Sequence, residues 1–326
     1  MRAPEFWHHR ESSVAAWLSP LGELYDAAGR LRSLLVHPVR LKRPVICVGN
    51  LTAGGAGKTP VALALAVWLQ ARGLKPHFLT RGYGGMSAGP VSVDPAKHGF
   101  RQVGDEALLL AAQAPTWVAR DRPAGARCAL AAGAELVILD DGLQNPSLAK
   151  DISLLVVDGG YGFGNGRVMP AGPLRETLER ALARVQAAVL VGSDECRLTP
   201  LLEERVPLLK AQLVAWESER VLAGKRVLAF AGIGRPAKFF ATLEALGCEL
   251  VLRRDFADHH AYRADEIMQL VEAAAALDAE PVTTEKDLVR FPPEARRMVR
   301  AVRVRLAFED PAALERLLGP LIARHG

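Results

Sequence analysis

The stretch Thr52-Ala53-Gly54-Gly55-Ala56-Gly57-Lys58-Thr59 decides the fold, because it joins a predicted strand to a predicted helix. The apolar run at 44–48 is typical of a buried strand, and 60–71 is typical of a helix that ends before Gly73. A glycine-rich turn lets backbone N–H groups converge on phosphates, and the helix N-terminus adds positive potential. We expect Lys58 to reach the β- and γ-phosphates and the Thr59 hydroxyl to bind Mg²⁺. These eight residues therefore predict a binding loop for a nucleoside triphosphate.

One position departs from the usual pattern GxxxxGK[ST], because Thr52 stands where the first glycine is expected. Gly54 and Gly55 inside the loop, together with the strand before it and the helix after it, restore most of the pattern. The alternative is a glycine-rich turn that binds nothing, and the strand–turn–helix context makes it the weaker interpretation.

Bulk composition restricts the class of protein. The 326 residues are enough for about two domains, and 50% of them are apolar and 24% charged, which is typical of a globular chain. The net charge of +5 suits phosphate-bearing ligands or an anionic membrane surface, but it is too small and too scattered to indicate nucleic acid. Because the four cysteines form no CxxC pair, we expect neither disulfides nor zinc, and a reducing compartment. We also expect no signal peptide and no transmembrane span.

Residues 14–35 form an amphipathic pattern that differs from the rest of the chain. Their apolar side chains recur every three or four residues, which predicts one stripe along a helix. Trp7 and Trp17 lie near it, and a basic cluster follows at Arg30, Arg32, Arg40, Lys42 and Arg43. Such a helix either lies on an anionic bilayer or packs its stripe on the protein's own core.

From residue 44 onward, short apolar runs alternate with helical patterns, which predicts an α/β fold: a P-loop NTPase-type parallel sheet with helices on both faces. The expected strands are 45–48, 76–80, 116–118, 136–139, 153–157 and 187–191, and the expected helices are 59–72, 105–114 and 122–132. A similar alternation of strands and helices starts near residue 225. Its expected strands are 227–230, 249–253 and 281–284, and its expected helices are 237–246 and 264–276. We therefore expect an N-terminal amphipathic helix and basic segment (1–43), a P-loop domain (44–220) and a smaller α/β domain (221–326).

Two aspartates end the predicted strand at 136–139. A carboxylate at the carboxyl end of a strand beside a phosphate loop is a suitable Mg²⁺ ligand in phosphoryl chemistry. We expect Asp140 to bind the metal, with Asp141 as the partner for a water or a second metal. A plain turn explains one such aspartate, but it does not readily explain two in succession.

Other polar residues fall in loops that follow predicted strands, where sites are commonly found. Arg81 is placed to steady an anionic ligand, and Arg175-Glu176 can present a charge pair to a phosphate and its metal. Asp105 opens a helix, where an aspartate is often only an N-cap. Asp258 and His259 together can handle a proton, although single histidines are usually structural.

Seven motifs in the same order resemble one known family. The sequence is similar to the tetraacyldisaccharide 4′-kinases of lipid A biosynthesis, and the motifs cover roughly residues 5–290. They are Gly49-Asn50-Leu51-Thr52 with Gly54 to Pro60, Arg81-Gly82-Tyr83-Gly84-Gly85, Gly104-Asp105-Glu106, Asp140-Asp141-Gly142-Leu143-Gln144, Pro173-Leu174-Arg175-Glu176, Asp258-His259-His260 and Thr283-Thr284-Glu285-Lys286-Asp287.

The resemblance implies two α/β/α domains, the second closing over the site of the first. It implies transfer of the γ-phosphate of ATP to the 4′-hydroxyl of an acylated glucosamine disaccharide 1-phosphate, forming lipid IVA. The reaction would take place at the cytoplasmic face of the inner membrane of a Gram-negative bacterium, with the N-terminal helix in contact with the bilayer.

The resemblance also implies roles for individual residues. Asp105 would be the catalytic carboxylate with His259 as its partner, and Asp140 or Asp141 together with Glu176 would bind the metal. We assign nucleotide binding to residues 52–59, and substrate binding to Asn50, Arg81, Gln144 and Arg175. Leu143 and Asn145 depart from the phenylalanine and histidine that are common in the family, so Asn145 is given no role.

Two other functions use a similar loop. P-loop switch GTPases and partition-type ATPases are one alternative, but the guanine-reading Asn-Lys-x-Asp motif is missing, because Glu285-Lys286-Asp287 has the wrong order. A membrane adaptor gated by nucleotide is the second alternative, and it would not phosphorylate a lipid.

Overall fold

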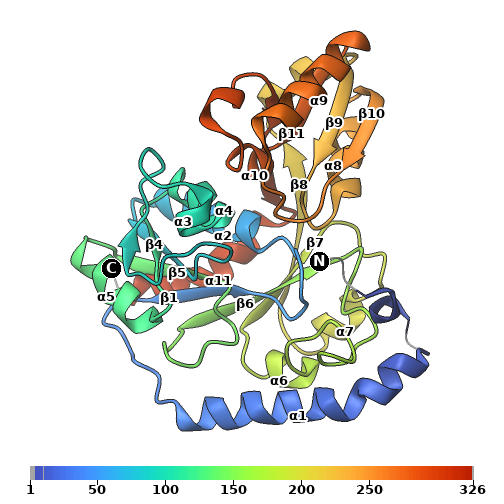
Figure 1. The fold of residues 1–326 in the computed structure, drawn as a ribbon. Coiled ribbons are helices and arrows are strands. Elements are labelled where there is room, and N and C mark those ends of the chain that lie inside the picture. Colours follow the sequence, from blue (N-terminus) through green and yellow to red (C-terminus); the bar gives the residue numbers. More distant parts are fainter. Residues whose placement is uncertain (1–3, 10, 325–326) are drawn as a thin grey trace.

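The computed structural model describes residues 4–9 and 11–324, and these form two lobes, each built on its own sheet. Figure 1 shows the smaller lobe standing above the larger one, with a long N-terminal helix lying along the opposite side of the larger lobe. The nine-stranded sheet of the large lobe has the order β13-β8-β7-β6-β1-β5-β2-β4-β3, and the four-stranded sheet of the small lobe has the order β10-β9-β11-β12.

The large sheet is parallel except at its two edges, where β3 and β13 pair antiparallel with their neighbours. Its central strands are buried along their whole length, which is why they read as continuous apolar runs in the sequence. The expected parallel α/β sheet is therefore confirmed. The strands are β1 (Val45–Gly49), β2 (Pro76–Thr80), β3 (Val91–Ser92), β4 (Thr116–Val118), β5 (Leu136–Asp140), β6 (Ile152–Asp158), β7 (Ala187–Val191), β8 (Leu208–Ala215) and β13 (Val304–Phe308).

Helices cover both faces of the large sheet. Side chains of α2 and α11 share one apolar cluster with the sheet, and side chains of α5, α6 and α7 belong to a second cluster. These helices are α2 (Lys58–Gln70), α5 (Arg122–Ala131), α6 (Leu178–Leu182), α7 (Thr199–Glu203) and α11 (Pro311–Ala323), and the short α3 (Phe100–Val103) and α4 (Asp105–Ala111) follow β3.

The small lobe is a parallel four-stranded sheet with apolar clusters on both of its faces. Its strands are β9 (Arg226–Ala231), β10 (Glu249–Asp255), β11 (Glu280–Thr284) and β12 (Arg300–Val302), and its helices are α8 (Pro236–Ala245), α9 (Ala264–Ala276) and α10 (Glu285–Leu288). Short 3₁₀ turns lie at η1 (Glu5–His8), η2 (Glu217–Leu222) and η3 (Pro293–Ala295).

The end of the chain differs from the expected division. Residues 221–326 are expected to form one unit, but β13 pairs with β8 of the large sheet, from Val304 opposite Ala215 to Phe308 opposite Ala211. Helix α11 then packs into the core of the large lobe through Leu314 and Leu318. The chain thus leaves the large sheet after β8, forms the small lobe, and returns.

Helix α1 (Ser13–Leu35) carries its apolar stripe on the outside. Its buried residues are small or polar (Ala15, Gly22 and Asp26), and its exposed large side chains are Val14, Trp17, Leu21, Leu24, Tyr25, Leu31, Leu34 and Leu35. The stripe therefore does not pack on the protein's own core. None of the helices in the described part of the chain is long and apolar enough to cross a membrane.

Polar contacts and one close approach attach α1 to the large lobe. Asp26 is 4% exposed, and its carboxylate accepts from Arg30 at 2.7 Å and from Arg180 at 3.3 Å. Arg180 also donates to the Ser33 hydroxyl at 2.9 Å. A Cβ at Gly22 would lie 2.7 Å from the carbonyl oxygen of Val168, which is closer than side-chain carbons normally approach. Gly22 is therefore required for this contact.

We expect Gly22→Ala to loosen the attachment of α1, because the added methyl group meets backbone that cannot rotate away. Overpacking of this kind costs about 1–3 kcal/mol. Gly29→Ala is the matched control, because its Cβ would meet only the flexible Arg180 guanidinium at 3.5 Å. Alanine there should favour the helix by up to about 1 kcal/mol. Faster amide hydrogen exchange along α1 in Gly22→Ala alone would support this, and equal exchange in the two variants would contradict it.

Candidate active site

The predicted phosphate loop connects β1 to α2, as expected. Gly54 and Gly57 have φ values of 116° and 88°, a region that side chains rarely adopt, so glycine is required at both positions. Thr52 instead forms an antiparallel bridge with Leu174, and the Ala53 N–H donates to the Pro173 carbonyl at 2.8 Å. Extended pairing suits a threonine, which explains why the first glycine of the usual pattern is not needed. Ala56 is buried, whereas Gly54 and Gly55 are exposed.

Asn50 shapes this loop from behind. Its side chain is fully buried, and its amide donates to the carbonyls of Thr52 at 2.8 Å and Gly54 at 3.3 Å. Its amide oxygen accepts from the Lys58 ammonium at 3.2 Å. The structure thus buries Asn50 inside the loop, whereas from the sequence we assign it to substrate binding.

Asp140 ends β5 and Asp141 follows it, but the two side chains have opposite surroundings. Asp140 is 1% exposed, and its Oδ1 has no hydrogen-bond partner. Burial, with a further contribution from Glu106, raises the pKa of Asp140 to about 7. Asp141 has a φ of 52° and accepts from one Arg175 nitrogen at 2.9 and 3.1 Å. Burial by itself would raise the pKa of Asp141. The cations of Lys58, 3.8 Å away, and Arg175 outweigh it and lower that pKa.

Glu176 lies in a network of cations and amides. It is 2% exposed, and its carboxylate pairs with Arg184 and, at 3.5 Å, with Arg180. Gln144 donates from Nε2 both to Glu176 at 3.1 Å and to the Asn50 carbonyl at 3.0 Å. Glu176 and Gln144 therefore link the phosphate loop to the segment that carries Arg175.

Asp105 and His259 meet across the two lobes. Asp105 begins α4 in the large lobe, and His259 lies in the loop after β10 of the small lobe with a φ of 58°. The Asp105 Oδ2 and His259 Nδ1 atoms are 2.8 Å apart, and Asp258 Oδ2 is 3.8 Å from the other ring nitrogen. Burial opposes ionisation of Asp105, but the His259 hydrogen bond and the charges of Lys286 and Arg290 lower its pKa. The pairing expected from the sequence is present.

The small lobe also approaches the phosphate loop itself. A Cβ at Gly234 would lie 3.5 Å from the Gly55 nitrogen. Beside it, Asp158 at the end of β6 accepts from Arg235 at 2.8 Å and Lys238 at 2.7 Å. The sequence predicts no role for Asp158, Arg235 or Lys238, although Asp158 ends a buried strand as Asp140 does.

Arg81 and Arg122 add positive charge at the ends of strands. Arg81 follows β2 and is exposed, and its charge reaches Arg122 in the first turn of α5. Arg122 is 3% exposed and its Nε has no hydrogen-bond partner. Burial lowers the pKa of Arg122 to about 10, against the attraction of Asp141 and Asp140. Arg122 was also missed; its only signal is its place just after a predicted strand.

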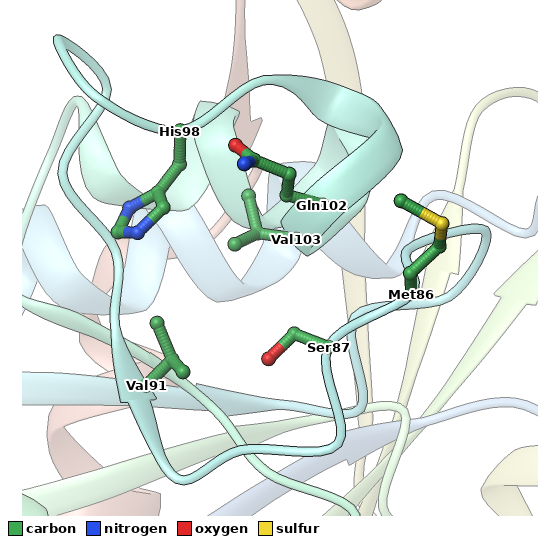
Figure 2. A pocket seen from close by; sticks show the side chains of 6 residues that line it. All are labelled: Met86, Ser87, Val91, His98, Gln102 and Val103. Carbon is green, nitrogen blue, oxygen red and sulfur yellow. The ribbon is translucent and has the colours of Figure 1, made fainter.

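Two cavities lie outside this cluster. One of about 330 Å³ is lined by Met86, Ser87, Val91, His98, Gln102 and Val103 (Figure 2), none of which is a predicted site residue. The other, of about 440 Å³, lies between α1 and the segment around Arg167, and Thr177 is part of its lining.

Oxygen ligands for a magnesium ion are available at the phosphate loop. The buried Asp140 oxygen without a partner fits a hard cation, and Thr59 lies in the first turn of α2. Within the part of the chain that the structure describes, no three His, Cys, Asp or Glu side chains are grouped to hold a metal. The residues therefore fit an ion that also takes ligands from a bound triphosphate, as Mg²⁺ commonly does.

Comparison with known proteins decides the family. A family model described as tetraacyldisaccharide-1-P 4′-kinase matches residues 14–322. The chain belongs to the tetraacyldisaccharide-1-P 4′-kinase family. The tetraacyldisaccharide 4′-kinases of Rhodospirillum rubrum and Rhodospirillum centenum are 56% and 54% identical to it. The alignments cover 99% of this chain in both cases, and 98% and 97% of the two relatives.

A solved structure agrees with the family. The crystal structure of LpxK from Aquifex aeolicus in complex with ATP superimposes with a TM-score of 0.74 at 27% sequence identity, covering 95% of this chain and 99% of that one. The chain is thus an ATP-dependent kinase enzyme of the lipid A 4′-kinase family. Neither the switch GTPase nor the membrane adaptor is favoured by these comparisons.

The raised pKa of Asp140 predicts that this residue destabilises the folded protein at alkaline pH. The unfolded chain ionises it near the ordinary value of 3.8, whereas the folded state keeps the proton up to about 7. Stability is therefore lost as pH rises between these values, and the loss is complete above the higher one. Asp140→Asn should raise the free energy of unfolding at pH 8 by about 4 kcal/mol and change it little near pH 3.5.

Asp141→Asn is the matched control, because the neighbouring cations favour ionised Asp141 in the folded state. It should lower stability at pH 8, the opposite sign to Asp140→Asn. Thermal unfolding of both variants at the two pH values checks this pair. A lower melting temperature for Asp140→Asn at pH 8 would contradict the assigned burial of an ionisable group.

Proposed function

We propose that Asp105 and His259 form the base that activates the 4′-hydroxyl of a tetraacyldisaccharide 1-phosphate for attack on the γ-phosphate of ATP. The 2.8 Å contact between them carries the proposal, because it joins the two lobes beside the phosphate loop. Two observations support a position of the pair near that loop: Glu106, next to Asp105, acts on the pKa of Asp140, and Gly234 of the small lobe lies against Gly55.

The proton has a defined path in this arrangement. With Nδ1–H donating to Asp105, the Nε2 atom of His259 is the free acceptor. The hydroxyl oxygen forms a bond to the γ-phosphorus while the bond from that phosphorus to the β–γ bridging oxygen breaks. The hydroxyl proton passes to Nε2, and ADP leaves. Asp105 keeps the ring oriented and stabilises the imidazolium that forms.

The phosphate loop, residues 52–59, supplies the electrostatic part. Lys58 lies between Asn50 and Asp141, so groups of the protein hold its ammonium in the loop. We assign Mg²⁺ to Thr59 and Asp140, with Asp141 and Glu176 orienting the cations around them. When bound there, the ion neutralises charge on the β- and γ-phosphates. Most of the rate enhancement should come from such positioning and charge.

The acceptor would approach from the side of Arg175. Arg175 and Gln144 are partly exposed beside the loop, and Arg81 is exposed at the next strand end, so these three fit contacts to a polar, phosphorylated sugar. Asn50 is better suited to shaping the loop, because it is buried. The cavity under α1 reaches Thr177, directly after Glu176, which supports an approach of the lipid between α1 and this segment.

Helix α1 supports a peripheral position at the cytoplasmic face of the inner membrane. Its side chains Trp17, Leu34 and Leu35 are 87%, 81% and 70% exposed, and the exposed arginines Arg30 and Arg32 lie on the same helix. Exposed apolar side chains next to basic ones favour the interface of an anionic bilayer. The acylated acceptor would be in the same bilayer.

Removal of either member of the proposed base tests the assignment. We expect Asp105→Asn and His259→Gln to lower kcat by about 10²–10⁴ while ATP still binds, because the phosphate loop is intact in both. His98→Gln, in the cavity of Figure 2, is the control and should retain the rate. The measurement is transfer of label from γ-labelled ATP to a tetraacyldisaccharide 1-phosphate, and near-normal transfer by either variant would rule out the pair.

The membrane assignment has a separate test. Trp17→Glu should reduce flotation with anionic phospholipid vesicles, since removing a large apolar side chain from the interface costs about 1.5–3 kcal/mol. Trp216→Glu is the matched control, because Trp216 is also exposed, at 48%, but lies outside α1. Equal flotation of the two variants would show that α1 does not contact the bilayer.

A further inference from the structure

The segment Thr283-Thr284-Glu285-Lys286-Asp287 has no role in the proposed proton transfer, yet it contains the fully buried charge of Asp287. Asp287 is 0% exposed. One of its carboxylate oxygens accepts from the Gly232 N–H, the Tyr262 hydroxyl and Arg290 Nη2, each at 2.8 Å. The other oxygen accepts from the Thr284 hydroxyl. Both carboxylate oxygens of Asp287 thus have hydrogen-bond donors, and the carboxylate holds the Arg290 guanidinium in place.

Arg290, held in this way, fixes the loop that carries His259. It is 1% exposed and donates to the carbonyls of Gly232 at 2.9 Å and His260 at 3.2 Å. The His259 N–H donates to the same Gly232 carbonyl at 3.1 Å. Arg290 therefore holds the His260 carbonyl directly. It holds the His259 N–H through the Gly232 carbonyl that both groups contact.

The same guanidinium reaches the large lobe. Arg290 Nε is 3.5 Å from Asp105 Oδ2, the oxygen that also contacts His259. Next to it, Lys286 Nζ is 3.2 Å from Glu106 Oε1. Two cations of the small lobe thus face two acids at the start of α4, and the titratable side chains of Asp258 and His259 lie beside them.

We propose that Arg290 and Lys286 are positioning residues for phosphoryl transfer: they hold the Asp105–His259 pair together across the lobes when the small lobe faces the phosphate loop. This inference rests on the proposed function, since it assumes that the pair accepts the proton. Asp287 and Tyr262 hold Arg290 in place, which gives the segment at 283–287 its role.

The charges have a direct consequence for the pH dependence. Lys286 and Arg290 both lower the pKa of Asp105, so removing either charge should raise it. The pair accepts the proton only in its unprotonated form, and a nearby positive charge favours that form. Removing either cation should therefore move the acid limb of the kcat–pH profile to higher pH. A purely structural role would lower kcat without moving this limb.

The experiment compares four variants of the full chain with the unaltered enzyme. Lys286→Met and Arg290→Met remove one charge each, Arg290→Lys keeps the charge but loses the guanidinium geometry, and Arg297→Met changes an exposed arginine nearby. Each is checked for folding by thermal unfolding, and label transfer from ATP is followed from acid to neutral pH. ATP affinity is measured on the same samples.

We expect Lys286→Met and Arg290→Met to move the acid limb up and lower kcat, with ATP affinity unchanged. Arg290→Lys should lower kcat, by about tenfold or more, without moving the limb, because a lysine cannot make the same set of hydrogen bonds. Arg297→Met should match the unaltered enzyme. If Arg290→Met does not fold, Lys286→Met and Arg290→Lys decide the question, because they leave Asp287 with a cation nearby.

An unmoved acid limb in folded Lys286→Met and unchanged kcat in Arg290→Lys would overturn the inference. Asp105→Asn and His259→Gln separate this result from failure of the proposed function. If these two lose transfer while the cation variants do not, only the positioning role is rejected. If these two retain transfer, the base itself has been misassigned.

Discussion

The carboxyl ends of β1, β2, β5 and β6 all lie on the same side of the large sheet, along the line where these strands end, because the strands run parallel. Every charged group that follows such a strand is therefore brought to the same edge. The phosphate loop follows β1, Arg81 follows β2, Asp140 ends β5 and Asp158 ends β6. The chemistry depends on this parallel arrangement, since antiparallel neighbours would send alternate groups to opposite edges.

Charge at this edge is balanced over short distances. Asp141 is surrounded by Lys58 and Arg175, Glu176 by Arg180 and Arg184, and Asp158 by Arg235 and Lys238. Asp140 differs from them, because its Oδ1 is buried without a hydrogen-bond partner. A buried carboxylate without a hydrogen-bond partner is costly to ionise and is suited to a cation.

Much of the fold could be predicted from the sequence, because the central strands are buried on both faces and their apolar runs are continuous. Strands β2, β4 and β7 and helix α9 have the expected bounds, and α4 begins at the expected Asp105. Strands β8 and β13 were missed, since both are half-buried and carry mixed side chains. That omission also hid the return of the chain to the large sheet.

The positions of candidate site residues were predictable where one motif supplies a group and its place in the fold, as in the loop after β1 and Asp140 at the end of β5. It was not predictable where a partner comes from a distant segment. The two arginines on Glu176, the cations on Asp158 and the burial of Asn50 depend on tertiary contacts that no local spacing records. The contact of Asp105 with His259 was expected only through the family resemblance.

The small lobe begins and ends on adjacent strands. Ala215 and Val304 are paired, and the Trp216 N–H donates to the Arg303 carbonyl at 3.1 Å, so both connections leave the large sheet side by side. A ribbon of two hydrogen-bonded strands flexes across its pleat but resists sliding lengthwise, since each slip breaks backbone hydrogen bonds. The paired connections therefore keep the small lobe, and His259 with it, in a fixed register to the large sheet.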